Sequence, residues 1–319
     1  MSDAMYGRAG TKFSYTNILD RKVVFDYGAH LIDVDPKPLS TGFRDWDRAC
    51  AETAEMGLGE WWYIIIGGAS NSGKTQLVRW LARQACDQER HPAIITMEVS
   101  AKGLQRHYYS DITSFGYYDL MPHKWMEGDS VGKVKQLVSE IESYTKEGNP
   151  IPDRHIMVVE AQGRPTIDEI EDEAHKLKEA GYTHLFIDHA QLIKPAQQMS
   201  IAEGAEELSE RMRIFAHSEK ICTVMASQLN RSASSQRKER PTMHSLYGGT
   251  SMESNSNQVI LLDHSRNERD PLYPHLLKTW LLLDKNREGP ARIHIPVEAN
   301  FKTGLWRQAE EDEADGWAS

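Results

Sequence analysis

One octapeptide constrains this chain more than any other feature. Residues 68–75 read Gly-Ala-Ser-Asn-Ser-Gly-Lys-Thr, which is the pattern G-x-x-x-x-G-K-T. They follow the apolar segment Trp61–Gly67 and open the amphipathic segment Lys74–Cys86. A phosphate-binding loop requires this context, because a strand and a helix on either side aim backbone N–H groups and the positive end of the helix at a phosphate. The sequence therefore predicts a strand, a nucleotide-binding loop and a helix in direct succession.

The residues of this loop have distinct predicted roles. Lys74 is expected to contact the β- and γ-phosphates, and the Thr75 hydroxyl to ligate Mg²⁺. A chance match to the pattern occurs in about one chain in a hundred of this length, and the flanking elements make chance rarer still. ATP and Mg²⁺ are therefore the predicted cofactors. The predicted nucleotide-binding residues are Gly68, Ala69, Ser70, Asn71, Ser72, Gly73, Lys74, Thr75 and Gln76.

Polar side chains follow three further apolar segments, where strands are expected to end. Glu98 is a candidate general base, although an ordinary acid at a helix start is an equal alternative from position alone. Asp188 ends the run His184–Asp188 and is a candidate Mg²⁺ residue together with Thr75. Gln228 is a candidate contact to the γ-phosphate, or an amide in a turn. In a parallel sheet the carboxyl ends of the strands border the ligand crevice, so these side chains are expected to meet there.

Apolar strands and amphipathic helices alternate along the chain. Several strands are continuous runs of Ile, Val and Leu, which is typical of a mostly parallel sheet covered on both faces. After about residue 255 the alternation weakens, and residues 286–290, Asn-Arg-Glu-Gly-Pro, predict an antiparallel hairpin. The fold class is therefore α/β. Strands are expected at Trp61–Gly67, Ala93–Met97, Ile156–Glu160, His184–Asp188, Cys222–Ser227, Gln258–Asp263, Trp280–Asp284 and Ile293–Pro296, and helices at Lys74–Cys86, Gly103–Phe115, Ser130–Tyr144, Thr166–Ala180 and Ile201–Ser218.

Composition divides the chain into three parts and limits its partners. We expect an arm or linker over residues 1–39, an ATPase domain over 40–307 and a disordered acidic tail over 308–319. The arm is expected to lie either on a neighbouring subunit or on its own domain. Three distant cysteines exclude a disulfide framework and a zinc site. The longest apolar run is far shorter than the roughly 20 residues of a membrane span. The expected location is cytoplasmic.

The sequence motifs together resemble the RecA-like ATPase domain of the DnaB family of replicative hexameric helicases. The resemblance implies a RecA-like P-loop fold and a ring of six subunits with ATP bound between neighbours. It implies that Glu98 is the general base and Gln228 the sensor, and that Lys285 and Arg287 reach into the neighbour's site. Without the resemblance, these two residues would be a basic turn on a solvated hairpin. The motifs are Ser40–Phe43, Thr96–Ser100, Ile187–Ile193, Ala226–Arg231 with Arg240–Pro241, and Asp284–Pro290.

The resemblance also implies that single-stranded DNA passes through the pore of the ring. The chain carries 37 Lys and Arg against 47 Asp and Glu, a net charge of −10, which excludes a broad basic surface. Residues 231–240 have a local charge of +3, however, so six copies would bring about +18 to one pore. A solvated charged loop is the alternative. The candidate DNA contacts are Lys194, Arg231, Arg237, Lys238, Arg240 and Tyr247.

The chain departs from the family pattern in two places. Tyr247 stands where the family carries an Arg, and Asn255 and Asn257 stand at later acid positions. Only about 39 residues precede the ATPase domain, too few for the family's primase-binding domain. The resemblance is therefore to a short form of phage or mobile-element type, with a possible loader or replication partner.

Two functions of different classes remain open from the sequence. The first is an ATP-dependent DNA helicase or translocase that moves 5′→3′ on single-stranded DNA in replication. The second is an ATP-switched oligomer, similar to RecA, RadA or KaiC, that binds DNA or recruits a partner without unwinding. A metabolic P-loop kinase is a weak third interpretation, because no segment resembles a lid or an acceptor pocket.

Overall fold

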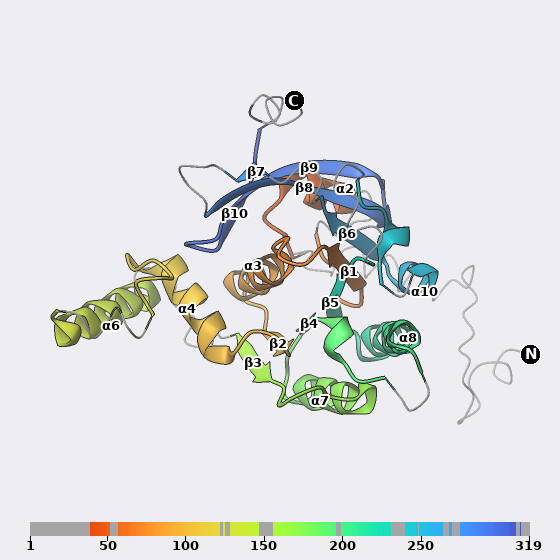
Figure 1. Ribbon diagram of the computed structural model, residues 1–319, viewed down its shortest axis with the longest axis horizontal. Coiled ribbons are helices and arrows are strands. Elements are labelled where there is room, and N and C mark those ends of the chain that lie inside the picture. Colours follow the sequence, from red (N-terminus) through yellow and green to blue (C-terminus); the bar gives the residue numbers. More distant parts are fainter. Residues whose placement is uncertain are drawn as a thin grey trace, which may run out of the picture. The chain divides into compact units, whose positions relative to one another are not determined.

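A mixed sheet of ten strands runs through the part of the chain that the computed structural model describes (Figure 1). The described residues are 39–51, 57–121, 124, 128–146, 156–195, 199–230, 240–247, 249–263, 268–269, 275–310 and 313, and all belong to one structural unit that begins at Pro38. The strands are β1 (Tyr63–Gly68), β2 (Pro92–Thr96), β3 (Met157–Glu160), β4 (His184–Asp188), β5 (Cys222–Gln228), β6 (Gln258–Leu262), β7 (Glu268–Arg269), β8 (Leu276–Asn286), β9 (Ile293–Asn300) and β10 (Leu305–Gln308).

The strand order is β10-β9-β8-β6-β1-β5-β4-β2-β3, and β7 pairs with β8. Every pairing from β3 across to β6 is parallel, whereas β8, β9 and β10 are antiparallel to their neighbours. The predicted α/β class, parallel sheet and antiparallel hairpin are therefore confirmed. The hairpin is longer than expected, because β8 and β9 extend well beyond Trp280–Asp284 and Ile293–Pro296.

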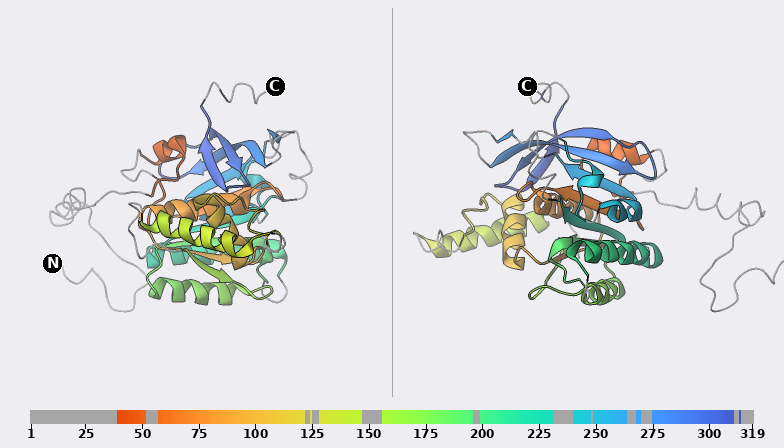
Figure 2. Two further views of the ribbon diagram at one scale, coloured as in Figure 1. Left: turned by 90° about the vertical axis from the view of Figure 1, so that its left-hand side faces the viewer. Right: turned by 45° about the vertical axis from the view of Figure 1, so that its right-hand side comes forward.

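Helices cover both faces of the sheet, which explains the continuous apolar strands. In β1, Ile64 and Ile66 belong to the core under α3, whereas Tyr63 and Ile65 belong to the core under α7 and α8. Beyond α4, the helix α6 extends away from the sheet (Figures 1 and 2). The α-helices are α2 (Arg44–Ala51), α3 (Lys74–Asp87), α4 (Ala101–Ile112), α6 (Ser130–Lys146), α7 (Ile167–Glu179), α8 (Ile201–Glu219) and α10 (Gly249–Asn255), and the short 3₁₀ helices are η1 (Ala190–Leu192) and η2 (Met243–Ser245).

The parallel register aligns the strand ends that the sequence singled out. Gly68 pairs with Gln228 across β1 and β5, and Thr96 pairs with Asp188 across β2 and β4. The amide of Met97 donates to the carbonyl of Asp188 at 3.0 Å. The phosphate-binding loop after β1 therefore lies at the same sheet edge as Asp188 and Gln228.

Among the described residues, the sequence missed the α-helices α2 and α10, the two short 3₁₀ helices, and the strands β7 and β10. The helix α2 has four charged residues in eight and carries no long apolar pattern. Gln308 and Ala309, predicted to belong to a disordered tail, are ordered: Gln308 ends β10 and Ala309 is 1% exposed. The rest of that tail, apart from Glu310 and Glu313, and the arm over 1–38 lie outside the described residues. None of the helices in the described ranges is long and apolar enough to cross a membrane.

A buried polar network ties α2 to the sheet. Gln258, which is fully buried, accepts a hydrogen bond from Trp46 Nε1 at 3.0 Å and donates to Asn286 Oδ1 at 3.1 Å. Asn286 in turn donates to the carbonyl of Ala49 at 3.0 Å. Because a buried polar group that loses its partner retains its desolvation cost, this network fixes one position of α2.

Replacing Gln258 with Leu should destabilise the fold. The substitution keeps the side-chain volume but deprives Trp46 and Asn286 of their present partner, so the free energy of unfolding should fall by about 2–4 kcal/mol. Chemical denaturation measures the change. Gln162→Leu, at an exposed position, is the matched control and should change stability by about 0.5 kcal/mol or less. Equal effects of the two substitutions would contradict the prediction.

The buried histidine at the start of β4 should make stability depend on pH. Burial and, to a smaller extent, the charge of Arg90 together lower the pKa of His184 to about 3. Below the unfolded value of about 6.5, the unfolded chain binds a proton that the folded chain does not, so stability falls as the solution is acidified. At pH 5 the loss relative to pH 7 should be about 2 kcal/mol. His184→Leu should remove this part of the pH dependence, and exposed His217→Leu should retain it.

Candidate active site

One cavity of about 490 Å³ collects the residues predicted to handle the nucleotide. Side chains from the phosphate-binding loop, from the end of β2 and from the end of β5 line it together. Residues far apart in the sequence therefore meet at the carboxyl edge of the parallel strands, as the topology of such a sheet requires. The lining comprises Ser70, Asn71, Gly73, Lys74, Thr75, Gln76, Glu98, His107, Tyr117, Tyr118, Gln228 and Phe301.

The phosphate-binding loop has the backbone geometry that its sequence predicts. Gly73 has φ of 101° and precedes the first residue of α3, so the loop ends in a left-handed conformation that favours glycine. A Cβ on Gly73 would also lie 3.2 Å from the Phe301 ring. The open N-terminus of α3 points its free N–H groups into the loop, which is a suitable site for an anion.

Lys74 lies where a phosphate would replace its present partners. Its ammonium group donates to the carbonyls of Gly68 and Ala69 at 2.9 and 2.7 Å. Burial lowers the pKa of Lys74 to about 8, and the carboxylates of Asp188 and Glu98 oppose this shift. A phosphate in the loop would add further negative charge beside this buried cation and favour its charged form.

Asp188 has a carboxylate oxygen of the kind that binds a magnesium ion. The residue is 2% exposed, and its Oδ1 atom has no hydrogen-bond partner among the described residues. Burial raises the pKa of Asp188, and a hydrogen bond with the Thr75 side chain opposes the rise. A hard cation with oxygen ligands suits this carboxylate and the adjacent hydroxyl. The predicted pair, Thr75 and Asp188, therefore fits Mg²⁺.

His189 joins the predicted base to the predicted sensor, a role that the sequence analysis missed. Its Nδ1 atom lies 3.2 Å from Oε2 of Glu98, and its Nε2 atom lies 3.0 Å from Nε2 of Gln228. One ligand atom from each of Glu98, Asp188 and His189 lies within 4.8 Å of the other two. Burial lowers the pKa of His189, and Asp188 opposes that shift. The position of His189 beside Asp188 in the sequence was the signal available.

Aromatic side chains surround the outer part of the cavity, and no sequence pattern had indicated them. The rings of His107 and Tyr117 are stacked with centroids 4.0 Å apart. Gln76 Nε2 lies 3.2 Å from His107 Nε2. Tyr118 is 62% exposed beside them, and Phe301 comes from the turn between β9 and β10. Gln76 and Phe301 lie far in the chain from the segment 107–118, and only the fold brings them to it.

Lys285 and Arg287 lie level with the amino end of β1, whereas the phosphate-binding loop follows its carboxyl end. The amide of Arg287 donates to Asn257, whose own amide donates to Tyr63, the first residue of β1. Five residues of β1 therefore separate this level from Gly68, which is about 16 Å at ~3.3 Å per residue. Both side chains donate to carbonyls of the α10 segment, Lys285 to Glu253 and Arg287 to Ser254. Burial and Arg287 lower the pKa of Lys285 to about 8.

Three of the predicted DNA contacts fall on described residues. Lys194 is exposed after η1, and Tyr247 donates its amide to the carbonyl of Gln228 at 2.9 Å. Arg240 is instead bound within the subunit, because its Nε lies 3.6 Å from buried Asp263 and its Nη1 lies 2.8 Å from His294 Nδ1. Arg231, Arg237 and Lys238 lie outside the described residues. Asn257, at a departure from the family pattern, has a structural contact: its Oδ1 accepts from the amide of Tyr63 at 3.0 Å.

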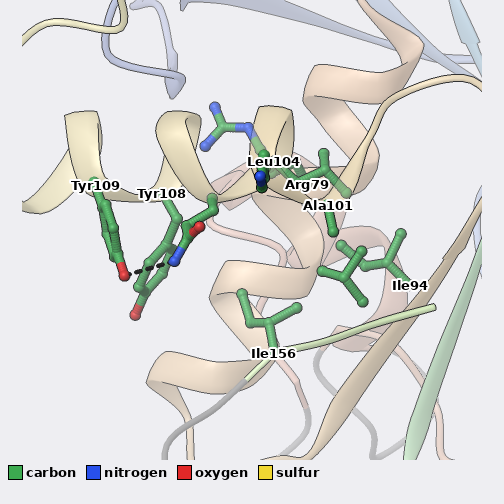
Figure 3. Close-up of a pocket in the computed structure, with 10 residues that line it drawn as sticks. Arg79, Ile94, Ala101, Leu104, Tyr108, Tyr109 and Ile156 are labelled. Atoms are coloured by element: carbon green, nitrogen blue, oxygen red, sulfur yellow. Dashed lines mark hydrogen bonds between the residues drawn. The ribbon is translucent and has the colours of Figure 1, made fainter. Parts of the chain in front are cut away.

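A second cavity of about 440 Å³ lies between α3, α4 and the strands β2 and β3 (Figure 3). Its lining is mainly apolar and includes Ile94, Leu104 and Ile156, with the Arg79 guanidinium at its edge. Gln105 donates to the Tyr109 hydroxyl at 2.8 Å beside it. None of the predicted site residues lines this cavity, so the nucleotide groups are gathered in the other one.

Comparison with known sequences gives a family match over most of the chain. Residues 38–306 match the model described as DnaB-like helicase C-terminal domain. The replicative DNA helicase DnaB of Helicobacter pylori is 24% identical over 231 residues, which cover 70% of this chain and 43% of the relative. DnaB of Mycoplasma pneumoniae is 23% identical over 157 residues, 46% of this chain and 33% of the relative. The chain thus spans less than half the length of the curated relatives it matches.

Solved structures share the fold. A solved ATPase domain superposes with a TM-score of 0.72 at 17% identity, over 93% of this chain and 100% of that domain. A DnaB-like replicative helicase gives 0.71 at 18% identity, over 92% of this chain and 68% of the other. The KaiC-like protein PH0186 from Pyrococcus horikoshii gives 0.54 at 17% identity, over 86% of this chain and 99% of the other. The RecA-like fold is confirmed, and the family match over residues 38–306 shows that this chain belongs to the DnaB-like helicase C-terminal domain family.

Proposed function

We propose that this chain is the motor domain of a replicative DNA helicase, a ring of six subunits that hydrolyses ATP to move 5′→3′ on single-stranded DNA. One observation carries the proposal. The predicted nucleotide residues meet beside one cavity at the carboxyl ends of the parallel strands: Lys74, Thr75, Asp188, Glu98 and Gln228. Lys285 and Arg287 lie level with the opposite ends of these strands. A subunit with this arrangement holds both halves of a catalytic site but cannot bring them together by itself.

The geometry supports a division of labour at the nucleotide. The α3 N-terminus and Lys74 bind the β- and γ-phosphates, and Thr75 and Asp188 hold Mg²⁺, which neutralises charge on the phosphate oxygens. Glu98 lines the cavity with a side chain that is 57% exposed, and it accepts the proton of the attacking water. Gln228 contacts the γ-phosphate from the tip of β5. Tyr117, Tyr118 and Phe301 offer the nucleobase a stacking surface at the outer end of the cavity.

The fingers complete the site from a neighbour. Charge that develops on the transferring phosphoryl group is stabilised by a cation placed against it, an effect worth about 10³–10⁵ in rate for an arginine finger. Arg287 and Lys285 are the cations proposed for this role. Lys285 is half-buried near the end of β8, and Arg287 is exposed in the turn that follows, so both can reach a second copy of the chain packed against that end of the strands.

The DNA contacts are proposed on the loops that leave the site. β5 ends at Gln228, and two residues later the amide of Asn230 donates to the carbonyl of Ser245 at 2.8 Å. The proposed backbone and base contacts are Arg231, Arg237 and Lys238, which lie outside the described residues, together with Lys194 and Tyr247. Arg240 is better placed as an anchor of the loop, because it already pairs with Asp263.

A second function remains in competition. An ATP-switched oligomer that binds DNA without unwinding needs fewer cations along its pore, and the engagement of Arg240 by Asp263 favours it. A duplex-unwinding assay separates the two. Strand separation that requires ATP and a 5′ single-stranded tail supports the helicase, whereas oligomerisation and DNA binding without separation support the switch.

Asp188→Asn should remove the dependence of nucleotide binding on Mg²⁺. An amide binds the cation far more weakly than a carboxylate, so Mg²⁺ should no longer strengthen ATP binding, and the affinity of Mg-ATP should fall about tenfold or more. The same change should raise the midpoint of thermal unfolding without nucleotide, because the folded protein no longer desolvates a carboxylate. Calorimetric titration with and without Mg²⁺ measures the first effect. A variant that still responds fully to Mg²⁺ would contradict the assignment.

Two inactive variants should restore activity when mixed. Lys74→Ala removes a phosphate contact in its own site, and Arg287→Ala removes the finger that the subunit lends to its neighbour. In mixed rings, an Arg287→Ala site beside a Lys74→Ala neighbour has every group, so an equal mixture should regain about a quarter of the wild-type single-stranded-DNA-stimulated ATPase activity. Each variant alone is the control. A mixture as inactive as its components would exclude catalysis by Arg287 across the subunit interface.

A further inference from the structure

His189 connects the two groups on which the proposed hydrolysis depends, and the proposed function gives it no role. It is the first residue after β4, its side chain is 4% exposed, and its Nδ1 atom is fully buried. One nitrogen faces Glu98 and the other faces Gln228, at 3.2 and 3.0 Å. The imidazole ring thus lies between a side chain from the end of β2 and one from the end of β5.

The chemistry of the partners determines the arrangement of protons. The Nε2 atom of a Gln carboxamide can only donate, so His189 Nε2 accepts that hydrogen bond. A neutral ring that accepts at Nε2 carries its proton at Nδ1. That proton faces the carboxylate of Glu98, which can only accept when ionised. The donors therefore point in one direction: the Gln228 carboxamide donates to the ring at Nε2, and the ring directs its Nδ1 proton toward the Glu98 carboxylate.

The two contacts differ in quality. Nδ1 is buried and has no aligned hydrogen bond among the described residues, although Oε2 of Glu98 is only 3.2 Å away. The Glu98 side chain is 57% exposed and is therefore the partner with freedom to move. A small rotation of that carboxylate completes the bond and gives Nδ1 the acceptor that it lacks, so His189 offers Glu98 one preferred orientation.

The Gln228 side of this connection is anchored more firmly. The side chain of Gln191, in η1, accepts from the backbone N–H of Gln228 at 2.9 Å and donates to the Ser227 hydroxyl at 2.8 Å. The turn after β4 and the tip of β5 are thus joined by two hydrogen bonds in addition to the one through His189. A change in the position of the Gln228 carboxamide is therefore passed to the ring against a fixed backbone.

We propose that His189 is a positioning residue that orients the Glu98 carboxylate and makes its orientation depend on where the Gln228 carboxamide lies. The inference rests on the proposed function, because it assumes that Glu98 acts on the attacking water and that Gln228 contacts the γ-phosphate. When Gln228 engages a γ-phosphate, its carboxamide moves relative to the ring, and the ring's contact with Glu98 changes with it. Hydrolysis is thereby coupled to the presence of the third phosphate.

Steady-state ATP hydrolysis by the full chain, with Mg²⁺ and single-stranded DNA, tests the assignment. His189→Ala should lower kcat roughly 10- to 100-fold, as expected when a reacting group loses its orientation. The Kd for a non-hydrolysable ATP analogue should stay within about threefold of wild type, because the ring does not itself bind the phosphates. His217→Ala, an exposed histidine on α8, is the matched control and should leave both values unchanged.

Two conservative variants separate the contacts and guard against a folding defect. The short amide of His189→Asn can reach the position of Nδ1 and should retain part of the Glu98 contact, so its kcat should exceed that of His189→Ala. His189→Gln extends toward Gln228 instead and should rescue less. If all three variants are equally slow and also unfold at lower temperature, the ring is a packing element and the proposal is overturned.

A double-mutant cycle with Gln228→Ala tests the coupling itself. If His189 acts through Gln228, the double variant should be no slower than the slower single variant, whereas independent roles give multiplied losses that overturn the proposal. A wild-type chain that binds ATP but never hydrolyses it would overturn the proposed function together with this inference. Wild-type hydrolysis with an unimpaired His189→Ala variant would overturn this inference alone.

Discussion

The parallel register of β1, β5, β4 and β2 is the constraint on which the rest of the molecule depends. It pairs Gly68 with Gln228 and Thr96 with Asp188, so four strands release their chains at one edge. Both faces of these strands are buried under helices, so most of their side chains are apolar and the polar groups of the site lie at or just beyond the strand ends. A slip of one residue would turn Ile64 and Ile66 into the opposite core and move the strand ends out of alignment. The site is therefore specified by the same packing that specifies the sheet.

That edge concentrates charges at a cost to stability. Lys74 and Asp188 are both buried. Burial lowers the pKa of Lys74 and raises the pKa of Asp188, so it favours the neutral form of each side chain. The Lys74 ammonium group donates hydrogen bonds to two carbonyls, whereas one oxygen of Asp188 has no hydrogen-bond partner in the described region. A phosphate and a cation satisfy both groups at once. Nucleotide binding should consequently stabilise the fold by more than the contacts of the phosphates alone would suggest.

The sequence predicted the parts of the site that are contiguous or end a strand. Lys74, Thr75 and Asp188 follow from a local pattern whose backbone geometry is nearly invariant, and the continuous apolar strands predicted the sheet around them. Tyr118 and Phe301 could not be predicted, because their proximity depends on how the turn after β9 meets the segment after α4. The helix α2 was missed because a buried network around Gln258, rather than an apolar stripe, holds it to the sheet.

The position of Arg287 is the structural basis for proposing that a second copy of the chain completes the site. The groups that bind phosphate lie at one end of β1, and the proposed fingers lie level with its other end. No side-chain rotation spans about 16 Å of strand, so the proposed fingers would have to act on the site of a second copy. Within one subunit, Lys285 at the end of β8 donates to a carbonyl of α10, and Asn286 donates to a carbonyl of α2. The end of β8 that carries the proposed fingers is therefore held within its own subunit, so the fingers and the phosphate-binding loop stay at fixed positions at opposite ends of the strands.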